Sequence, residues 1–223
     1  MPNLRIDIGC GPKKRPGYLG VDHSPHEGVD YVCDIERDAL PFEDTSVSDV
    51  FSSHCLEHLR DPERFFREIG RVAKDGACVE IWTPYAFSNG AFMFSHLQFL
   101  TEDHYAHMCI LFPEAYLSMT GVYWEWESVT YIVLPHTMVE LDRANVSINF
   151  GIKYLKNVVL EFGVVLHVRK SSCRPTHPKR YVSVSRDGAR HLLPDPLPVA
   201  ESDVCQALER SRNHHQSRIG TRF

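Results

Sequence analysis

The sequence predicts an α/β fold with a mostly parallel sheet, and three observations support this prediction. Short apolar segments recur in the first half of the chain, each bounded by Gly, Pro, Asp or Ser. Such segments are typical of buried parallel strands. A helical repeat of apolar residues separates two of the segments, and strands that alternate with helices or loops form parallel sheets. The length of 223 residues also fits one domain with an appendage.

Five strands are expected before residue 85, and a helix is expected between the fourth and the fifth. The expected strands cover residues 4–8, 18–21, 29–33, 48–53 and 78–83. Phe65, Ile69 and Val72 fall at helical spacing within residues 61–74. Asp61 is the expected N-cap of this helix, because Pro62 follows it in the first turn.

The pattern changes after residue 85. Residues 86–157 are rich in aromatic side chains and are expected to form an insertion that includes a long strand ending near 129–134 and a helix at 145–159. A last strand is expected at 164–169. The domain is therefore expected to span residues 1–170, with residues 171–223 as a C-terminal extension that contains a short helix at 203–212.

Charge separates these two parts. Residues 171–223 carry nine Lys and Arg against five Asp and Glu, a net +4, whereas residues 1–170 carry fifteen against twenty-four, a net −9. Three interpretations of the basic extension stay open: a cover for a ligand cleft, a strap onto a second acidic subunit, or a solvated extension.

The composition excludes several classes of protein. Hydrophobic residues make up 43% and charged residues 24%, as in globular proteins rather than disordered chains. The longest apolar run is far shorter than the roughly 20 residues of a membrane span. The first strand begins at residue 4, which leaves no room for a signal peptide. The seven scattered cysteines, without a CxxC pair, are expected as reduced thiols in a cytoplasmic protein. The net charge of −5 argues against a nucleic-acid partner.

Glycines and acidic residues follow the first three expected strands. Gly9 and Gly11 permit a tight turn close to a ligand, at the sheet edge where open parallel sheets bind ligands. Lys14 stands where a dinucleotide-binding loop would have its third glycine, so a pyrophosphate dinucleotide is not expected. Asp22 can bind both hydroxyls of a ribose, and Asp34 can accept a hydrogen bond from an adenine amino group. The alternative is that both are surface residues of turns.

These features lie in three continuous runs: LRIDIGCGPKKRPGYLGVDHSP, VDYVCDIERDALPFEDTSVSDVFSSHCLEHL and FFREIGRVAKDGACVEIWTPY. Together they resemble the class I S-adenosylmethionine-dependent methyltransferases, and most of all a small bacterial branch with a GCGPKKRPG loop in place of the first helix. The resemblance covers about residues 4–105. It implies a Rossmann-like, mostly parallel sheet with an antiparallel last strand, a first helix reduced to a loop, and S-adenosylmethionine as the cofactor.

The resemblance also implies a set of cofactor contacts. The glycine loop corresponds to the part that holds the methionine portion, the acid after the second strand to the ribose-binding residue, and the pair after the third strand to the adenine site. The start of the fourth-strand motif faces the sulfonium. The expected cofactor-binding residues are Asp7, Gly9, Cys10, Gly11, Asp22, His23, Asp34, Ile35, Ser53 and His54. The helices that often cover this cofactor are missing, so residues 86–150, the extension or the second subunit of a homodimer must provide the cover.

The expected reaction is direct displacement at the methyl group, for which the protein mainly aligns the reactants and excludes water. A general base is needed only when the acceptor must lose a proton; His54 is the first candidate and Tyr85 the second. Trp124 and Trp126 share one face of a strand and are expected either to line the acceptor pocket with Tyr85 or to pack in the core.

The run His54-Cys-Leu-Glu57-His58 also matches the HxxEH pattern of zinc hydrolases. That pattern requires one helix that carries both histidines, and His54 ends an expected strand instead, so no metal is expected. The expected function is methylation of an oxygen, nitrogen or carbon atom of a small-molecule metabolite or natural-product intermediate. The alternatives are a non-catalytic S-adenosylmethionine-binding partner subunit and a zinc hydrolase.

Overall fold

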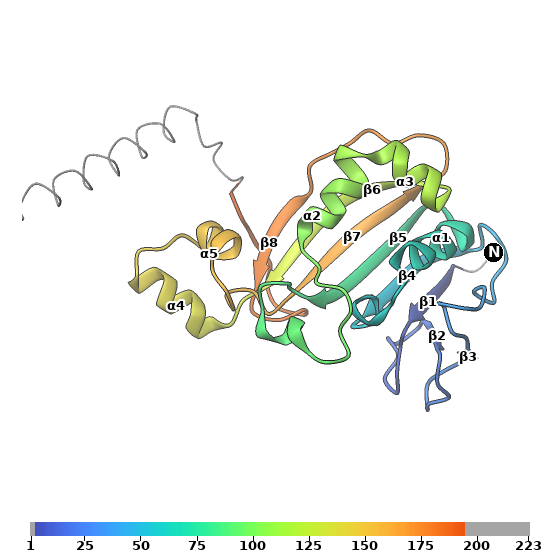
Figure 1. Cartoon of the computed structure of the whole chain (residues 1–223), viewed down its shortest axis with the longest axis horizontal. Coiled ribbons are helices and arrows are strands. Elements are labelled where there is room, and N and C mark those ends of the chain that lie inside the picture. The colour runs from blue at the N-terminus through green and yellow to red at the C-terminus, as the bar shows by residue number, and fades with distance from the viewer. Residues whose placement is uncertain (1–2, 195–223) are drawn as a thin grey trace, which may run out of the picture. The chain divides into compact units, whose positions relative to one another are not determined.

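The computed structural model describes residues 3–194, which form one nine-stranded sheet with helices packed against it (Figure 1). The strands are β1 (Leu4–Ile8), β2 (Leu19–Asp22), β3 (Tyr31–Val32), β4 (Val47–Ser53), β5 (Ala73–Pro84), β6 (Tyr123–Ile132), β7 (Glu161–Arg169), β8 (Lys179–Ser183) and β9 (His191–Leu192). The helical segments are η1 (Leu56–His58), α1 (Pro62–Val72), η2 (Asn89–Phe92), α2 (Glu102–Ala106), η3 (His107–Leu111), α3 (Pro113–Thr120), α4 (Pro135–Arg143) and α5 (Ile148–Tyr154).

The strand order is β3-β2-β1-β4-β5-β7-β6-β8-β9. The strands from β1 to β5 pair in parallel, and β7 runs antiparallel to both β5 and β6. The predicted mostly parallel sheet with a reversed last strand is therefore confirmed for the methyltransferase-like part. The chain crosses over between β1 and β4, so the carboxyl ends of β1, β2 and β4 meet at one edge, where open α/β sheets bind ligands.

Helix α1 begins and is buried as its sequence predicts. The Asp61 carboxylate accepts a hydrogen bond from the Arg64 backbone N–H at 3.1 Å, as an N-cap does, and Pro62 is the first helical residue. Phe65, Ile69 and other apolar side chains of this helix are fully buried against the sheet. Helices α1, α2 and α3 all lie over the same face of the sheet in Figure 1.

A loop takes the place of a first helix between β1 and β2, as the resemblance implies. This loop packs on the sheet face opposite α1, because Phe51 alternates along β4 with the core residue Val50. The Tyr18 ring makes an edge contact with Phe51 at 6.4 Å between centroids, and the Arg15 guanidinium lies 4.3 Å from the Phe51 ring centroid. Arg15 also forms an ion pair of 2.6 Å with Glu80 on β5. Side chains of the loop therefore cover this face of the central strands.

The aromatic-rich insertion contains more regular structure than its sequence indicates. The long strand is β6, which begins at Tyr123 and ends two residues before the predicted end. The helix expected at 145–159 is the shorter α5, and α4 is an additional helix that begins at Pro135. No helix among the described residues has the length and hydropathy to cross a membrane.

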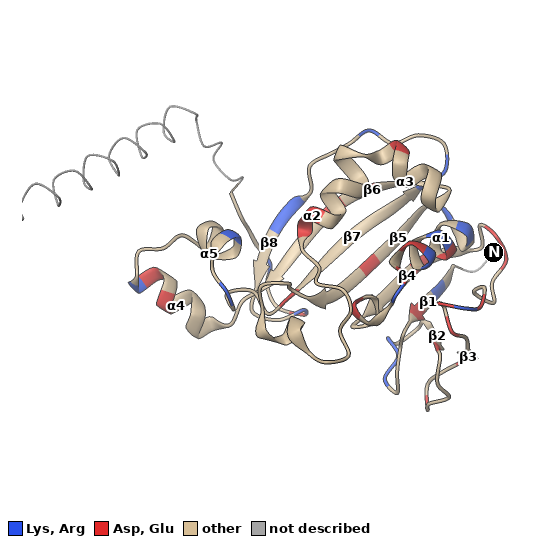
Figure 2. Ribbon diagram, in the orientation of Figure 1, with Lys and Arg blue, Asp and Glu red and all other residues tan. Residues whose placement is uncertain are grey.

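The sheet continues beyond residue 170. Strand β8 pairs in parallel with β6, with Thr130 opposite Tyr181, and β9 returns antiparallel to β8. The compact unit runs to Leu193, so the boundary expected at residue 170 falls inside the sheet. Figure 2 shows Lys and Arg side chains of the basic C-terminal segment, in blue, on β8. The helix expected at 203–212 lies outside the described residues.

Candidate functional site

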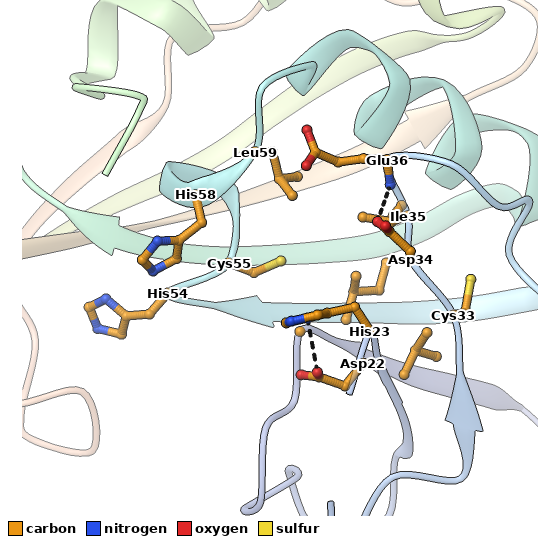
Figure 3. A pocket seen from close by; sticks show the side chains of 13 residues that line it. Asp22, His23, Cys33, Asp34, Ile35, Glu36, His54, Cys55, His58 and Leu59 are labelled. Atoms are coloured by element: carbon orange, nitrogen blue, oxygen red, sulfur yellow. Dashed lines mark hydrogen bonds and ion pairs between the residues drawn. The ribbon is translucent and has the colours of Figure 1, made fainter. Parts of the chain in front are cut away.

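A cavity of about 330 Å³ lies at the carboxyl ends of β1, β2 and β4 (Figure 3). Six of the ten predicted cofactor residues line it: Gly9, Asp22, His23, Asp34, Ile35 and His54. Sequence reasoning missed the other seven lining residues: Ile8, Val21, Cys33, Glu36, Cys55, His58 and Leu59. All of these except Leu59 are neighbours in sequence of a predicted residue or belong to the HxxEH run, so sequence proximity was the available signal.

Asp22 is fixed at the end of β2 with its carboxylate turned to the loop and the cavity. Its Oδ2 accepts a hydrogen bond from the Gly11 N–H and its Oδ1 accepts one from the Ser24 N–H, both at 2.9 Å. The residue is only 8% exposed. Because a carboxylate oxygen can accept two hydrogen bonds, Oδ2 can still bind one hydroxyl of a ribose, and Oδ1 can bind the other in place of its 3.2 Å contact with Nδ1 of His23.

The loop after β1 has the backbone that its glycines predict. Gly9 and Gly11 have φ angles of +70° and +54°, which favour glycine. A Cβ at Gly9 would lie 2.5 Å from the Cβ of Cys55, so the loop approaches the turn after β4 more closely than any side chain permits. Asp7 is 3% exposed and accepts a hydrogen bond from the Arg15 N–H at 2.7 Å. Asp7 therefore braces the loop, and burial raises the pKa of its carboxyl group.

The expected adenine end of the cavity lies beyond β3, which comprises only two residues. Asp34 follows two residues after the end of this strand, and its Oδ1 accepts a hydrogen bond from the Glu36 N–H at 3.1 Å. Ile35 is 6% exposed and lines the cavity beside Leu59. An acidic side chain next to an apolar wall suits a base with an exocyclic amino group.

Three predicted cofactor residues, Asp7, Cys10 and Ser53, line a second cavity of about 420 Å³, which shares Gly9 with the first. Gly11 belongs to the lining of neither cavity, and its contribution is the N–H that holds Asp22. Burial raises the pKa of the Cys10 thiol to about 11, so this thiol is not a nucleophile at neutral pH.

His54 occupies a strained position at the end of β4. Its φ of +54° lies in the left-handed region, which is uncommon for a residue with a side chain. Its Nδ1 lies 3.0 Å from Glu57 Oε1, and its Nε2 lies 3.0 Å from Glu161 Oε2 and 2.7 Å from Arg186 Nη2. The hydrogen bonds to Glu161 and Glu57 raise the pKa of His54 to about 9, against burial and the Arg186 charge. Both ring nitrogens are engaged, so neither is free to accept a proton from a substrate, contrary to the expected base role.

Arg186 completes this cluster from the segment expected to lie outside the domain. Its Nε and Nη2 bind the two carboxylate oxygens of Glu161 at 2.9 and 2.6 Å, and its Nη1 donates to Ser53 Oγ at 2.7 Å. Its guanidinium also lies 4.9 Å from the Trp82 ring centroid. Burial alone would raise the pKa of Glu161, but the hydrogen bonds from Arg186 and His54 outweigh it and lower the pKa to about 2.

The structure corrects three predicted acceptor-site residues. Tyr85 is 2% exposed, lines neither cavity and donates its hydroxyl to Glu102 at 2.8 Å, and burial raises its pKa far above the usual range. Trp124 and Trp126 do share one face of β6, but both are buried in the core, where Trp124 meets the ring of Phe66 on α1. Core packing, the second of the two expected interpretations, explains these tryptophans.

The HxxEH run lies on no α-helix of the described chain. His54 belongs to the turn after β4, and only Leu56–His58 form a single 3₁₀ turn, η1. The two histidines therefore do not have the arrangement of a zinc hydrolase, as expected.

The residues at the cavity fit S-adenosylmethionine. A carboxylate with spare acceptor capacity stands at the ribose position, an acid and an apolar wall stand at the adenine position, and glycine backbone leads to the second cavity. Asp22, Asp34 and Ile35 would hold the nucleoside.

Comparison with known proteins agrees with this fit. Residues 19–80 match the family model described as a methyltransferase domain. Ajmaline N-methyltransferase from Rauvolfia serpentina is 48% identical over 103 residues, which cover 36% of this chain and 35% of that protein. Norajmaline N-methyltransferase from the same plant is 33% identical over 111 residues, which cover 40% and 38%. The chain thus spans little more than a third of the length of either relative.

A solved structure shows the same fold. The S-adenosylmethionine-dependent methyltransferase from Archaeoglobus fulgidus superimposes with a TM-score of 0.51 at 16% identity, covering 74% of this chain and 86% of that one. This likeness covers a larger part of the chain than the segment that matches the family model. Residues 19–80 are therefore similar to a methyltransferase domain, and the chain has the fold of the Archaeoglobus fulgidus enzyme.

Proposed function

We propose that this chain transfers the methyl group of S-adenosylmethionine to an oxygen, nitrogen or carbon nucleophile of a small molecule. The cavity at the carboxyl ends of β1, β2 and β4, with Asp22 and Asp34 at adjacent strand ends, is the observation that carries this proposal. When bound, the cofactor supplies a methyl group activated by the positive charge of its sulfonium.

The chain's own contribution is to bind and orient the reactants. Asp22 holds the ribose and Ile35 packs against the base, which fixes the position of the methyl group. His54 acts as a positioning residue, because Glu57 and Glu161 hold its ring in place at the edge of the cavity. Alignment of this kind accounts for a large part of the rate of such displacements. The loop of residues 9–17 supports assignment to the small branch of the class with a GCGPKKRPG loop.

We place an apolar acceptor against the loop after η2. Five large apolar side chains are exposed there, and Phe94 has an exposed fraction of 111%, which means that no residue of the described part of the chain covers it. The five are Phe92, Met93, Phe94, Leu97 and Phe99. An exposed patch of this kind marks a binding surface. Nitrogen is the first acceptor atom to test, because both curated relatives are named as N-methyltransferases.

Calorimetric titration with S-adenosylmethionine and with its demethylated product tests the proposal at the cofactor. Micromolar binding of both is expected. The variant Asp22→Asn should bind at least about tenfold more weakly, because a hydrogen bond to a charged acceptor contributes roughly 1.5–3 kcal/mol. Asp142→Asn, on the exposed surface of α4, is the matched control and should bind like the native chain. If neither compound binds below millimolar concentration, the proposal fails.

Turnover separates an enzyme from a non-catalytic binding subunit. Panels of apolar amines, phenols and carboxylic acids are incubated with the cofactor, and products heavier by one CH2 group are sought by mass spectrometry. The acceptor surface is supported if one of these acceptors is methylated and its KM is higher in Phe94→Ser than in the native chain, while the cofactor affinity is unchanged. Tight cofactor binding without turnover of any acceptor would favour the partner-subunit alternative.

A further inference from the structure

Three side chains with metal-binding chemistry meet beside the cofactor cavity. Glu57 and His58 belong to η1, and His96 belongs to the loop after η2. One ligand atom from each lies within 4.8 Å of those of the other two. The rings of His58 and His96 are in edge contact, with centroids 4.8 Å apart. The set differs from the HxxEH pair, because the second histidine is His96 and not His54.

Both histidines are held in the same tautomer. Nδ1 of His58 lies 2.9 Å from the carbonyl oxygen of Ser95, and Nδ1 of His96 lies 3.1 Å from that of Ala91. A carbonyl oxygen only accepts hydrogen bonds, so each Nδ1 must carry the hydrogen. The lone pair of each neutral ring is then on Nε2. Metal-binding histidines have this arrangement, in which a backbone carbonyl orients the ring from the other nitrogen.

Glu57 supplies a carboxylate whose second oxygen has no partner. The side chain is 1% exposed, and Oε1 is engaged with His54 Nδ1 at 3.0 Å. Oε2 is buried and makes no hydrogen bond. A buried polar group without a partner destabilises a fold by roughly 1–3 kcal/mol, so such groups usually have a ligand or a function. A cation at this position would remove that cost, and His54 would orient the ligating carboxylate from behind.

The backbone holds the two parts of the cluster together. The N–H groups of Leu97 and Gln98 both donate to the carbonyl oxygen of Glu57, at 2.7 and 3.0 Å. The Gln98 side chain also donates to the Leu59 carbonyl oxygen at 2.8 Å. These bonds attach the loop that carries His96 directly to η1, so the two segments that carry the three ligands are held together before any ion binds.

We infer that Glu57, His58 and His96 bind one divalent cation of the kind that prefers imidazole, with Zn²⁺ as the representative ion. Two histidines and one carboxylate form an open zinc site that leaves a coordination position for another ligand. Ligand atoms around Zn²⁺ lie about 3.3 Å apart, so the three ligand atoms, which lie within 4.8 Å of one another, would move closer together on binding. Because His58 also lines the cofactor cavity, the ion would lie at its edge and could hold a donor atom of the acceptor. That last role rests on the proposed function, whereas the cation site does not.

The test measures metal binding by the full chain without cofactor, so its outcome does not depend on methyl transfer. The metal-free chain is titrated with Zn²⁺ by calorimetry and with Co²⁺ by visible absorption. We expect one ion per chain at micromolar affinity or tighter. His96→Ala and Glu57→Gln should each weaken binding more than about 100-fold, since loss of an outer-shell partner alone costs up to that much. His136→Ala, an exposed histidine on α4, is the matched control and should leave binding unchanged.

Circular dichroism melting of each variant shows whether it is folded, and His96 is the safer position because its side chain lies in a surface loop. Three results would overturn the inference: no ion bound below millimolar concentration, equal affinity in His96→Ala and in the native chain, or a strong sulfur-to-cobalt charge-transfer band, which would indicate cysteine ligands. Weak Co²⁺ bands typical of nitrogen and oxygen ligands, lost in His96→Ala and kept in His136→Ala, would establish the site.

Discussion

Replacing Arg186 by Gln removes the positive charge from the cluster at the carboxyl end of β4. The variant loses both hydrogen bonds from the guanidinium to Glu161 and the one to Ser53. Glutamine keeps much of the length of the side chain but cannot form the two-pronged pair with a carboxylate. The Glu161 carboxylate, whose side chain is 20% exposed, then retains His54 as its charged partner.

The pKa of Glu161 sets the size of the effect. The fall of this pKa from 4.5 to about 2 means that Arg186 and His54 together stabilise the ionised carboxylate by roughly 3 kcal/mol. His54 contributes part of this interaction, so loss of Arg186 should lower the free energy of unfolding by roughly 2 kcal/mol at pH 7. For a chain of this size, that is a decrease in Tm of about 4–8 °C.

Urea unfolding at several pH values measures the effect and its sign. Glu161 has a lower pKa in the folded state than in the unfolded state, so its contribution is fully present above about pH 4.5 and is lost as the pH falls toward 2. The stability difference between the native chain and Arg186→Gln should therefore be constant near neutral pH and should shrink below about pH 4.5. Arg190→Gln, an exposed arginine four residues further along, is the control. No difference at pH 7, or one that stays the same at pH 3, would refute the reasoning.

Three further substitutions test the packing around the site. Gly163→Ala would place a Cβ 2.4 Å from the Trp82 ring and should destabilise the fold by about 1–3 kcal/mol, measured by thermal melting. Gly9→Ala combines a left-handed backbone with a clash against Cys55, and a loss of about 2–5 kcal/mol is expected; stability within 1 kcal/mol of the native chain would show that the loop moves freely. Tyr85→Phe removes a hydroxyl that donates to the half-buried carboxylate of Glu102 and should cost about 1.5–3 kcal/mol without changing the affinity for S-adenosylmethionine, measured by calorimetry; weaker cofactor binding would restore Tyr85 to the site.

The sequence predicted those elements whose signals are local. The cap at Asp61, the apolar repeat of α1 and the glycine loop depend on neighbouring residues, and all three are as expected. Strand β8 was not predicted, because it lies in a basic, proline-containing segment and is stabilised by pairing with β6, more than 40 residues earlier. Tertiary pairing of this kind overrides weak local propensity.

In the candidate site, too, the residues with local sequence signals could be predicted, and those placed by tertiary contacts could not. Asp22 and Asp34 could be predicted because the carboxyl ends of neighbouring parallel strands meet at one edge. For Trp124 and Trp126 the pocket and the core both stay open in the sequence, because a strand pattern shows which residues share a face, but not which face is the core. His96 carried no signal in the sequence, since its contact with His58 depends on how the loop returns to η1.

The residues of the charged cluster at the carboxyl end of β4 lie far apart in the sequence, and this separation affects the order in which the site forms during folding. The cofactor cavity is lined by residues between Ile8 and Leu59, so it depends on contacts that close short loops. His54 and Glu161 are 107 residues apart, and Ser53 and Arg186 are 133 apart. Contacts between distant residues form late in folding, because their loop-closure entropy must be met before they stabilise the chain. A folding intermediate that lacks β8 and the residues after it would thus contain the nucleoside-binding half of the site without Arg186, and refolding kinetics followed by tryptophan fluorescence and by cofactor binding would resolve the two steps.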